Sequence, residues 1–204
     1  RGAVLLGKGT FSVVGSLKIS TSGVVLRGSG MGENGTTVIG TGFSRENVIT
    51  VSGKNDRKLE GKIRIANSYV PVDAVKFRLA NVDGLKASDA VQIQRPSTKE
   101  WIQTIGTEHC GGGATTLGWK AGQRDIFWDR TIVSIAGNEI TIDAPLTTAL
   151  DSAFGRGSLS KCQWQGKIAQ VGVENLRLLS SFDETNPKDE DHRWVGISLE
   201  NVQD

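Results

Sequence analysis

The sequence predicts an all-β fold in which the first and last segments are coils of a parallel β-helix. The first 53 residues consist of short apolar fragments separated by Gly and Ser, a spacing too dense for β-α-β units. A short motif near the end of the chain recurs after 26 residues (173 to 199). This recurrence favours stacked coils over a hairpin meander or a barrel.

We assign residues 1–66 to the first coils of this helix. The apolar cores of the expected strands are 4–6, 10–14, 16–19, 24–27, 37–39 and 48–51. Glycine between them favours tight turns, because it adopts positive φ or allows close backbone approach at low cost. The 26 glycines and only 4 prolines of the chain fit many short strands joined by turns.

The recurring motif is Val173-Glu174-Asn175-Leu176, repeated as Leu199-Glu200-Asn201-Val202. The shift suits one coil plus a loop, in a solenoid whose strands stack about 4.8 Å apart over a continuous aliphatic core. Asparagine tolerates a left-handed backbone and hydrogen-bonds along such a stack. We therefore expect Asn175 and Asn201 to be structural turn residues, and residues 161–204 to be resumed coils.

Residues 67–160 predict a β-rich subdomain inserted between the coils. Alternating strands are expected at 72–79, 90–94, 131–135 and 139–142, with Gly137-Asn138 as a hairpin turn. One short helix is expected after Pro96. There, Ser97-Thr98-Lys99-Glu100 forms a capping box followed by apolar residues.

Composition excludes some classes of protein. Lys and Arg number 24 against 22 Asp and Glu, a surplus too small for a nucleic-acid surface. No run of about 18 apolar residues predicts a membrane span, and the first residues are not a signal peptide. Cys110 and Cys162 lack metal-site spacing; one disulfide and two buried thiols both remain open.

Several segments resemble the pectate-lyase-like superfamily of right-handed parallel β-helix proteins. Residues 2–11 (GAVLLGKGTF) resemble the first coil, with Gly7-Lys8 where Pro-Ala is common and Phe11 where Tyr is common. Landmarks similar to those of large secreted bacterial β-helix proteins are 22–34, 128–130, 144–148 and 186–192. The resemblance covers nearly the whole chain and is more specific for fold than for chemistry.

The resemblance implies a right-handed, single-stranded parallel β-helix, the N-terminal portion of a secreted protein that is extracellular or periplasmic. Members are mostly polysaccharide lyases and glycoside hydrolases, with some phage tailspikes and esterases. We expect an acidic, pectin-like polysaccharide as partner, further coils after Asp204, and catalytic residues within this chain or beyond it. A non-catalytic carbohydrate-binding or scaffold module and a structural spike are the alternatives.

The densest polar cluster is 189–194 (DEDHRW). Lyase or hydrolase chemistry needs acids, a base such as a histidine that titrates near neutral pH, and a cation that stabilises negative charge. The candidate catalytic residues are Asp189, Asp191, His192 and Arg193. The candidate calcium ligands are Asp189, Glu190 and Asp191, because Ca²⁺ takes several carboxylate oxygens. Trp194 is a candidate sugar-stacking residue. A solvated loop with its Trp packed on the core is the alternative.

A second cluster of tryptophans and acids lies in the middle segment. Trp119 and Trp128 are candidate substrate-binding residues, since exposed Trp beside acids is typical of a sugar-binding surface. Trp101 is instead expected to anchor its own short helix. Ordinary core packing is the alternative for all of them, because aromatic residues usually pack before they bind.

Overall fold

The computed structural model describes residues 1–109 and 118–203, which form two compact units. The first unit comprises residues 1–56 and 164–204, and the second comprises residues 57–163, which interrupt the first in sequence. The limits predicted from the sequence are 66/67 and 160/161. They differ because residues 58–64 form a strand of the second unit's sheet rather than the end of a coil.

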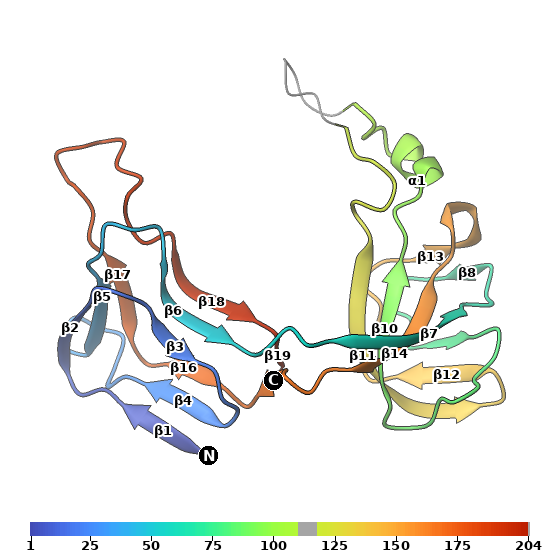
Figure 1. Ribbon diagram of the computed structural model, residues 1–204, viewed down its shortest axis with the longest axis horizontal. Helices are drawn as coiled ribbons and strands as arrows, with labels where there is room; N and C mark the ends of the chain where they lie inside the picture. The colour runs from blue at the N-terminus through green and yellow to red at the C-terminus, as the bar shows by residue number, and fades with distance from the viewer. Residues whose placement is uncertain (110–117, 204) are drawn as a thin grey trace. The chain divides into compact units, whose positions relative to one another are not determined.

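The first unit is built from short parallel strands that follow one another around successive coils (Figure 1). The first coil contains β1 (Gly2–Leu5), β2 (Gly9–Val13) and β3 (Leu17–Ile19). The second contains β4 (Val24–Arg27), β5 (Thr36–Gly40) and β6 (Asn47–Ser52). The third contains β15 (Ile168–Ala169), β16 (Gly172–Glu174), β17 (Arg177–Ser180) and β18 (Val195–Glu200), and β19 (Val202–Gln203) follows it. The strands expected in residues 1–53 are confirmed.

Strands of equal rank in the three coils pair to make three parallel sheets. Their orders are β1-β4-β16, β2-β5-β17 and β3-β6-β18, and β19 pairs with β15. Aliphatic side chains from the second coil, including Val38, Ile49 and Val51, are buried between these sheets. The unit therefore has the architecture of a parallel β-helix, and its core is continuous along the stack.

The two asparagines of the recurring motif occupy two corners of the same coil. Asn175 and Asn201 have φ of 54° and 53°, so the predicted turn role is confirmed. They do not mark neighbouring coils, because Val173 pairs with Leu26 whereas Leu199 pairs with Val51. The 26-residue recurrence is thus a repeated corner and not a coil period.

The second unit is centred on a six-stranded antiparallel sheet of order β7-β14-β10-β11-β12-β9. Its strands are β7 (Lys58–Arg64), β9 (Lys76–Arg78), β10 (Ala90–Arg95), β11 (Ile126–Ala136), β12 (Glu139–Ile142) and β14 (Ser158–Gln163). A short pair is formed by β8 (Tyr69–Val70) and β13 (Leu150–Asp151), and the 3-10 turn η1 (Ser152–Phe154) follows β13. One face of the sheet packs on a separate apolar core that includes Phe77, Ile93 and Leu159.

The predicted hairpin and helix are both present. Ala136 pairs with Glu139 across the Gly137-Asn138 turn. The helix α1 (Lys99–Thr104) begins one residue later than expected, with Thr98 as its N-cap, and the Thr98 hydroxyl accepts from the Trp101 backbone N–H at 3.3 Å. Ser97 does not cap the helix because its hydroxyl donates to Asp125 instead.

Within the described residues, no helix is long and apolar enough to cross a lipid bilayer. Cys162 is buried on β14. Cys110 lies outside the described residues.

Candidate functional site

The acidic cluster lies on the loop between β17 and β18, residues 181–194, and two of its aspartates organise that loop. The Asp189 carboxylate accepts hydrogen bonds from the backbone N–H groups of Asp183 and Asp191, at 2.8 and 2.9 Å. The Asp183 carboxylate accepts from both the backbone and the hydroxyl of Thr185, at 2.9 and 2.6 Å. Both acids therefore act first as turn-forming groups, as aspartate commonly does.

These hydrogen bonds also favour the charged form of both acids. The backbone N–H groups of Asp183 and Asp191 lower the pKa of Asp189 below its usual value. The hydroxyl and backbone N–H of Thr185 do the same for the pKa of Asp183. A general acid for glycosidic cleavage needs the opposite shift, toward a raised pKa. The hydrogen bonds of both aspartates therefore act against that role.

Trp194 is held at the base of the loop by a cation and a carbonyl group. Its side chain is exposed (60%), and its indole Nε1–H donates to the Glu190 carbonyl oxygen at 3.3 Å. The Arg45 guanidinium lies 4.9 Å from the centre of the indole ring and pairs with the Glu190 carboxylate at 2.6 Å. Asp191 lies 3.7 Å from the same guanidinium. The structure thus joins Trp194, Glu190 and Asp191 through Arg45.

Arg45 was absent from the candidates of the sequence analysis. It lies 145 positions from Glu190 in sequence, in the connection between β5 and β6. Only the stacking of coils brings it to the loop, and no local pattern signals that contact. Together, Trp194, Arg45 and Glu190 form an exposed group that we call the Trp194 platform.

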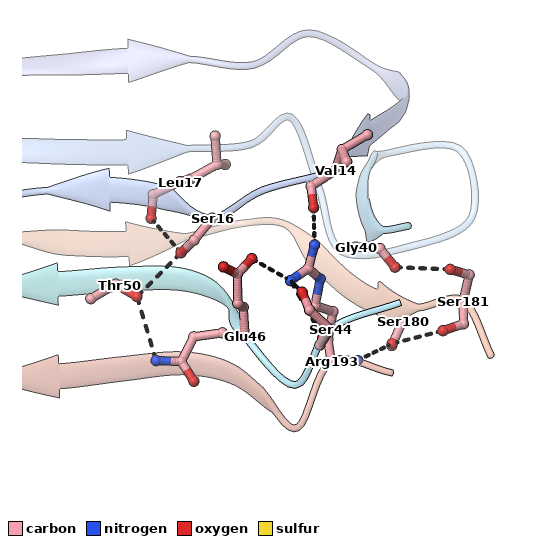
Figure 2. Close-up of polar contacts among 11 residues, drawn as sticks. Val14, Ser16, Leu17, Gly40, Ser44, Glu46, Thr50, Ser180, Ser181 and Arg193 are labelled. Carbon is pink, nitrogen blue, oxygen red and sulfur yellow. Dashed lines mark hydrogen bonds and ion pairs between the residues drawn. The ribbon is translucent and has the colours of Figure 1, made fainter. Parts of the chain in front are cut away.

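Arg193, the residue before Trp194, reaches toward Val14, Ser44 and Glu46 (Figure 2). Its side chain has no exposed surface and pairs with Glu46 at 2.7 Å, and its guanidinium also donates to the Ser44 hydroxyl at 2.9 Å and to the Val14 carbonyl oxygen. The hydrogen bond from Arg193 is the main cause that lowers the pKa of Glu46. Because the guanidinium is buried and its partners are groups of the protein, Arg193 serves structure.

The remaining candidates on the loop do not converge on one point. Asp189 is occupied by backbone N–H groups, whereas Glu190 and Asp191 face Arg45. Among the described residues, no group of three or more His, Cys, Asp and Glu side chains is arranged to hold a metal ion. The ring of His192 contacts the Arg193 carbonyl oxygen through Nδ1 at 3.1 Å. The predicted calcium ligands are therefore not gathered here.

The tryptophans of the second unit divide between core and surface. Trp128 is only 5% exposed, packs in the core beneath the sheet and donates to the Thr147 hydroxyl at 2.9 Å, so the expectation of an exposed sugar-binding Trp128 is wrong. The reason is strand parity, since Trp128 pairs with buried Ile93. Trp119 is half-buried and stacks on Trp101, with ring centres 6.0 Å apart.

Comparison with known proteins finds similarity to solved structures only. No protein-family model and no curated protein matches the chain. Among solved structures, 99% of the chain matches the Gp54 tailspike of Acinetobacter baumannii bacteriophage AP22, in complex with A. baumannii capsular saccharide, with a TM-score of 0.51 at 11% identity. The chain is similar in fold to a phage tailspike.

Two further tailspikes match with lower scores. The tailspike gp49 of Pseudomonas phage LKA1 has a TM-score of 0.38 at 15% identity over 84% of the chain, and gp61 of Pseudomonas phage phi297 has 0.41 at 13% over 98%. The chain spans about a quarter of the length of these tailspikes, 27%, 25% and 28% in turn.

Proposed function

We propose that this chain is the polysaccharide-binding part of a larger, secreted parallel β-helix protein. The observation that carries the proposal is the Trp194 platform. An exposed indole ring, oriented by Arg45 and by the Glu190 carbonyl group, offers a flat apolar face beside polar groups. Such a combination suits a sugar ring, which has an apolar face and a hydroxyl rim.

The fold agrees with this proposal. The AP22 tailspike, which shares the fold, is in complex with a capsular saccharide. We propose that the full protein is a right-handed β-helix of the pectate-lyase-like kind and that it handles an acidic polysaccharide. This chain spans 27% of the AP22 tailspike, whose chain is thus about four times as long. We propose that the activity of the whole protein likewise depends on residues outside this chain.

Binding is better supported than cleavage by the 181–194 loop. The pKa values of Asp183 and Asp189 are lowered, and Arg193 is buried in an ion pair. A lyase or hydrolase reaction in the full protein is the second proposal, with His192 as the base this chain contributes. Incubation with uronate-containing polysaccharides, followed by the absorbance of unsaturated products and by reducing ends, tests that reaction.

The binding proposal is tested by retention on a glycan array. Trp194→Ala is expected to reduce retention of the chain about tenfold, because it removes the stacking surface. Met31→Ala is the control, since Met31 is similarly exposed (68% against 60%) in the same unit but belongs to the connection between β4 and β5. Unchanged retention of a folded Trp194→Ala variant would remove the platform from the binding site.

A further inference from the structure

The face of the second unit's sheet opposite its core carries a row of polar side chains. Arg64 pairs with Ser158, Ser158 with Gln94, and Gln94 with Phe127, across β7, β14, β10 and β11. Cross-strand partners point to the same face of a sheet. Their neighbours in sequence, among them Ile65, Ile93 and Trp128, form the core. The row is therefore on the outer face.

A pocket of about 320 Å³ opens over this row. It is lined by Lys62, Arg64, Gln94, Pro96, Gly155, Gly157 and Ser158. Among these described lining residues, two are cations and none is an acid. The volume lies at the lower end of the range for ligand pockets, which suits one sugar residue of a chain. Phe127 is 51% exposed beside Gln94 and adds an apolar ring.

One polar group of the pocket is fixed in place. The Gln94 amide donates to the Asp125 carboxylate at 2.6 Å, and the same carboxylate accepts from the Ser97 backbone N–H at 2.7 Å and from its hydroxyl at 2.8 Å. Burial raises the pKa of Asp125, but the hydrogen bonds from Ser97 and Gln94 outweigh it and leave the pKa lowered. The Asp125 charge thus orients Gln94 and is also attracted to Lys62, one of the two cations of the pocket.

We propose that this pocket binds a carboxylate-bearing sugar residue of an acidic polysaccharide. Arg64 supplies the planar guanidinium that pairs with a carboxylate through two hydrogen bonds, and Lys62 adds a second positive charge. Ser158 and Gln94 offer hydrogen bonds to ring hydroxyls, and Phe127 offers a stacking surface. The polysaccharide nature of the ligand rests on the proposed function. The pocket adds the site that prefers acidic over neutral saccharides.

The charge of the 181–194 loop supports this assignment. That loop carries five acids, Asp183, Glu184, Asp189, Glu190 and Asp191, against Lys188 and the buried Arg193, which is paired with Glu46. Like charges repel, so the loop disfavours an anionic sugar and suits the neutral parts of a chain. We therefore assign recognition of the sugar carboxylate to the pocket of the second unit, which is lined by Lys62 and Arg64.

The experiment is calorimetric titration of the 204-residue chain with an oligogalacturonate and with the same oligosaccharide after reduction of its carboxyl groups. We expect the acidic ligand to bind at least about tenfold more tightly than the reduced one. Arg64→Gln and Lys62→Gln should each abolish most of that preference. Lys76→Gln is the matched control, because Lys76 is an exposed lysine on β9 of the same sheet, outside the pocket.

Each outcome bears on one proposal. Equal affinity for the two ligands, or a preference that survives both pocket substitutions in folded protein, would overturn the pocket assignment. If Trp194→Ala still weakens binding in that case, the proposed function stands without the pocket. Absence of binding to acidic and neutral saccharides alike would overturn both proposals. If the pocket bound sulfate ions as tightly as the oligogalacturonate, it would be an unspecific anion site, and the sugar assignment would be overturned.

Discussion

At the scale of single residues, Arg193 is a buried link between three connections of the first unit. Its guanidinium contacts Val14 between β2 and β3, and Ser44 and Glu46 between β5 and β6, while its backbone N–H donates to the Ser180 hydroxyl at 3.0 Å. Added Cβ atoms on Gly40 and Gly42 would lie 2.6 and 2.2 Å from the Arg193 side chain. The glycines thus leave the space that this arginine fills.

Arg193→Met is expected to lower the free energy of unfolding by about 2–3 kcal/mol, because hydrogen bonds of a buried charge are lost and their acceptors are left unpaired. Chemical denaturation followed by circular dichroism measures it. Arg45→Met is the matched control: Arg45 pairs with Glu190 on the surface, where an ion pair contributes about 0–1 kcal/mol. Equal effects of the two substitutions would show that Arg193 is not a structural link.

The hydrogen-bonded aspartates of the 181–194 loop predict that the order of this loop depends on pH. Because the folded-state pKa of Asp189 lies below the unfolded one, its contribution is present above the unfolded pKa and is lost as pH falls through the folded pKa. We therefore expect the loop to begin to lose its order only when the pH falls below about 4, the ordinary value for an aspartate. The amide signals of Asp183 and Asp191 in an NMR titration should report it.

Asp189→Asn is the control for this titration. The asparagine oxygen keeps one of the two hydrogen bonds that the Asp189 oxygens accept, the other is lost, and the amide does not titrate, so this contribution to the pH dependence should disappear. Persistence of the same transition in Asp189→Asn would assign it to another group.

At the scale of elements, glycine and asparagine stack at the corners of the coils. The backbone N–H of Gly28 donates to the Glu174 carbonyl oxygen at 2.9 Å, and that of Gly53 donates to the Glu200 carbonyl oxygen at 3.0 Å. A Cβ on Gly28 would lie 2.2 Å from the Asn175 carbonyl oxygen. Neighbouring coils approach too closely at this corner for any side chain.

Gly28→Ala should therefore destabilise the first unit by about 1–3 kcal/mol through overpacking against backbone that cannot move aside. Gly32→Ala is the matched control in the same connection, where an added Cβ meets nothing within 4 Å. Thermal unfolding of both variants compares them. A Gly28→Ala variant as stable as Gly32→Ala would contradict the stacked corner.

Strands and turns could be predicted from the sequence better than side-chain contacts between distant segments. Strands of the first two coils, the Gly137-Asn138 hairpin and the left-handed asparagines depend on local chemistry, and they were predicted. The strand β7 was missed, because polar residues such as Lys58 and Lys62 obscure its apolar face. Contacts across coils, such as Arg193 with Glu46, depend on stacking that no local pattern encodes.

At the scale of the whole molecule, the described residues form two hydrophobic cores, one in each unit. The second unit begins and ends in paired strands, because Lys58 pairs with Gln163. Its ends therefore lie together, as in a segment that can be excised. The sequence limits of 67 and 160 would instead remove β7, with Ile63 and Ile65, from this core.

A fragment of residues 57–163 is expected to fold alone, with a cooperative melting transition and dispersed amide signals. The fragment 67–160 is the control and should not, because it loses a strand of the sheet and exposes the edge of β14. Cooperative unfolding of the shorter fragment with equal stability would show that β7 is dispensable and would contradict the observed unit limits.

The binding proposal for the full chain meets its sharpest test in an NMR titration that follows the indole Nε1–H signal of Trp194. The signal is assigned by its loss in Trp194→Phe, and saccharides from the array are added in increasing amounts. We predict a saturable shift of this signal, because a sugar stacked on the ring changes its environment and its hydrogen bond to Glu190. A neutral saccharide that the chain binds while the Trp194 signal stays unmoved would contradict the proposal.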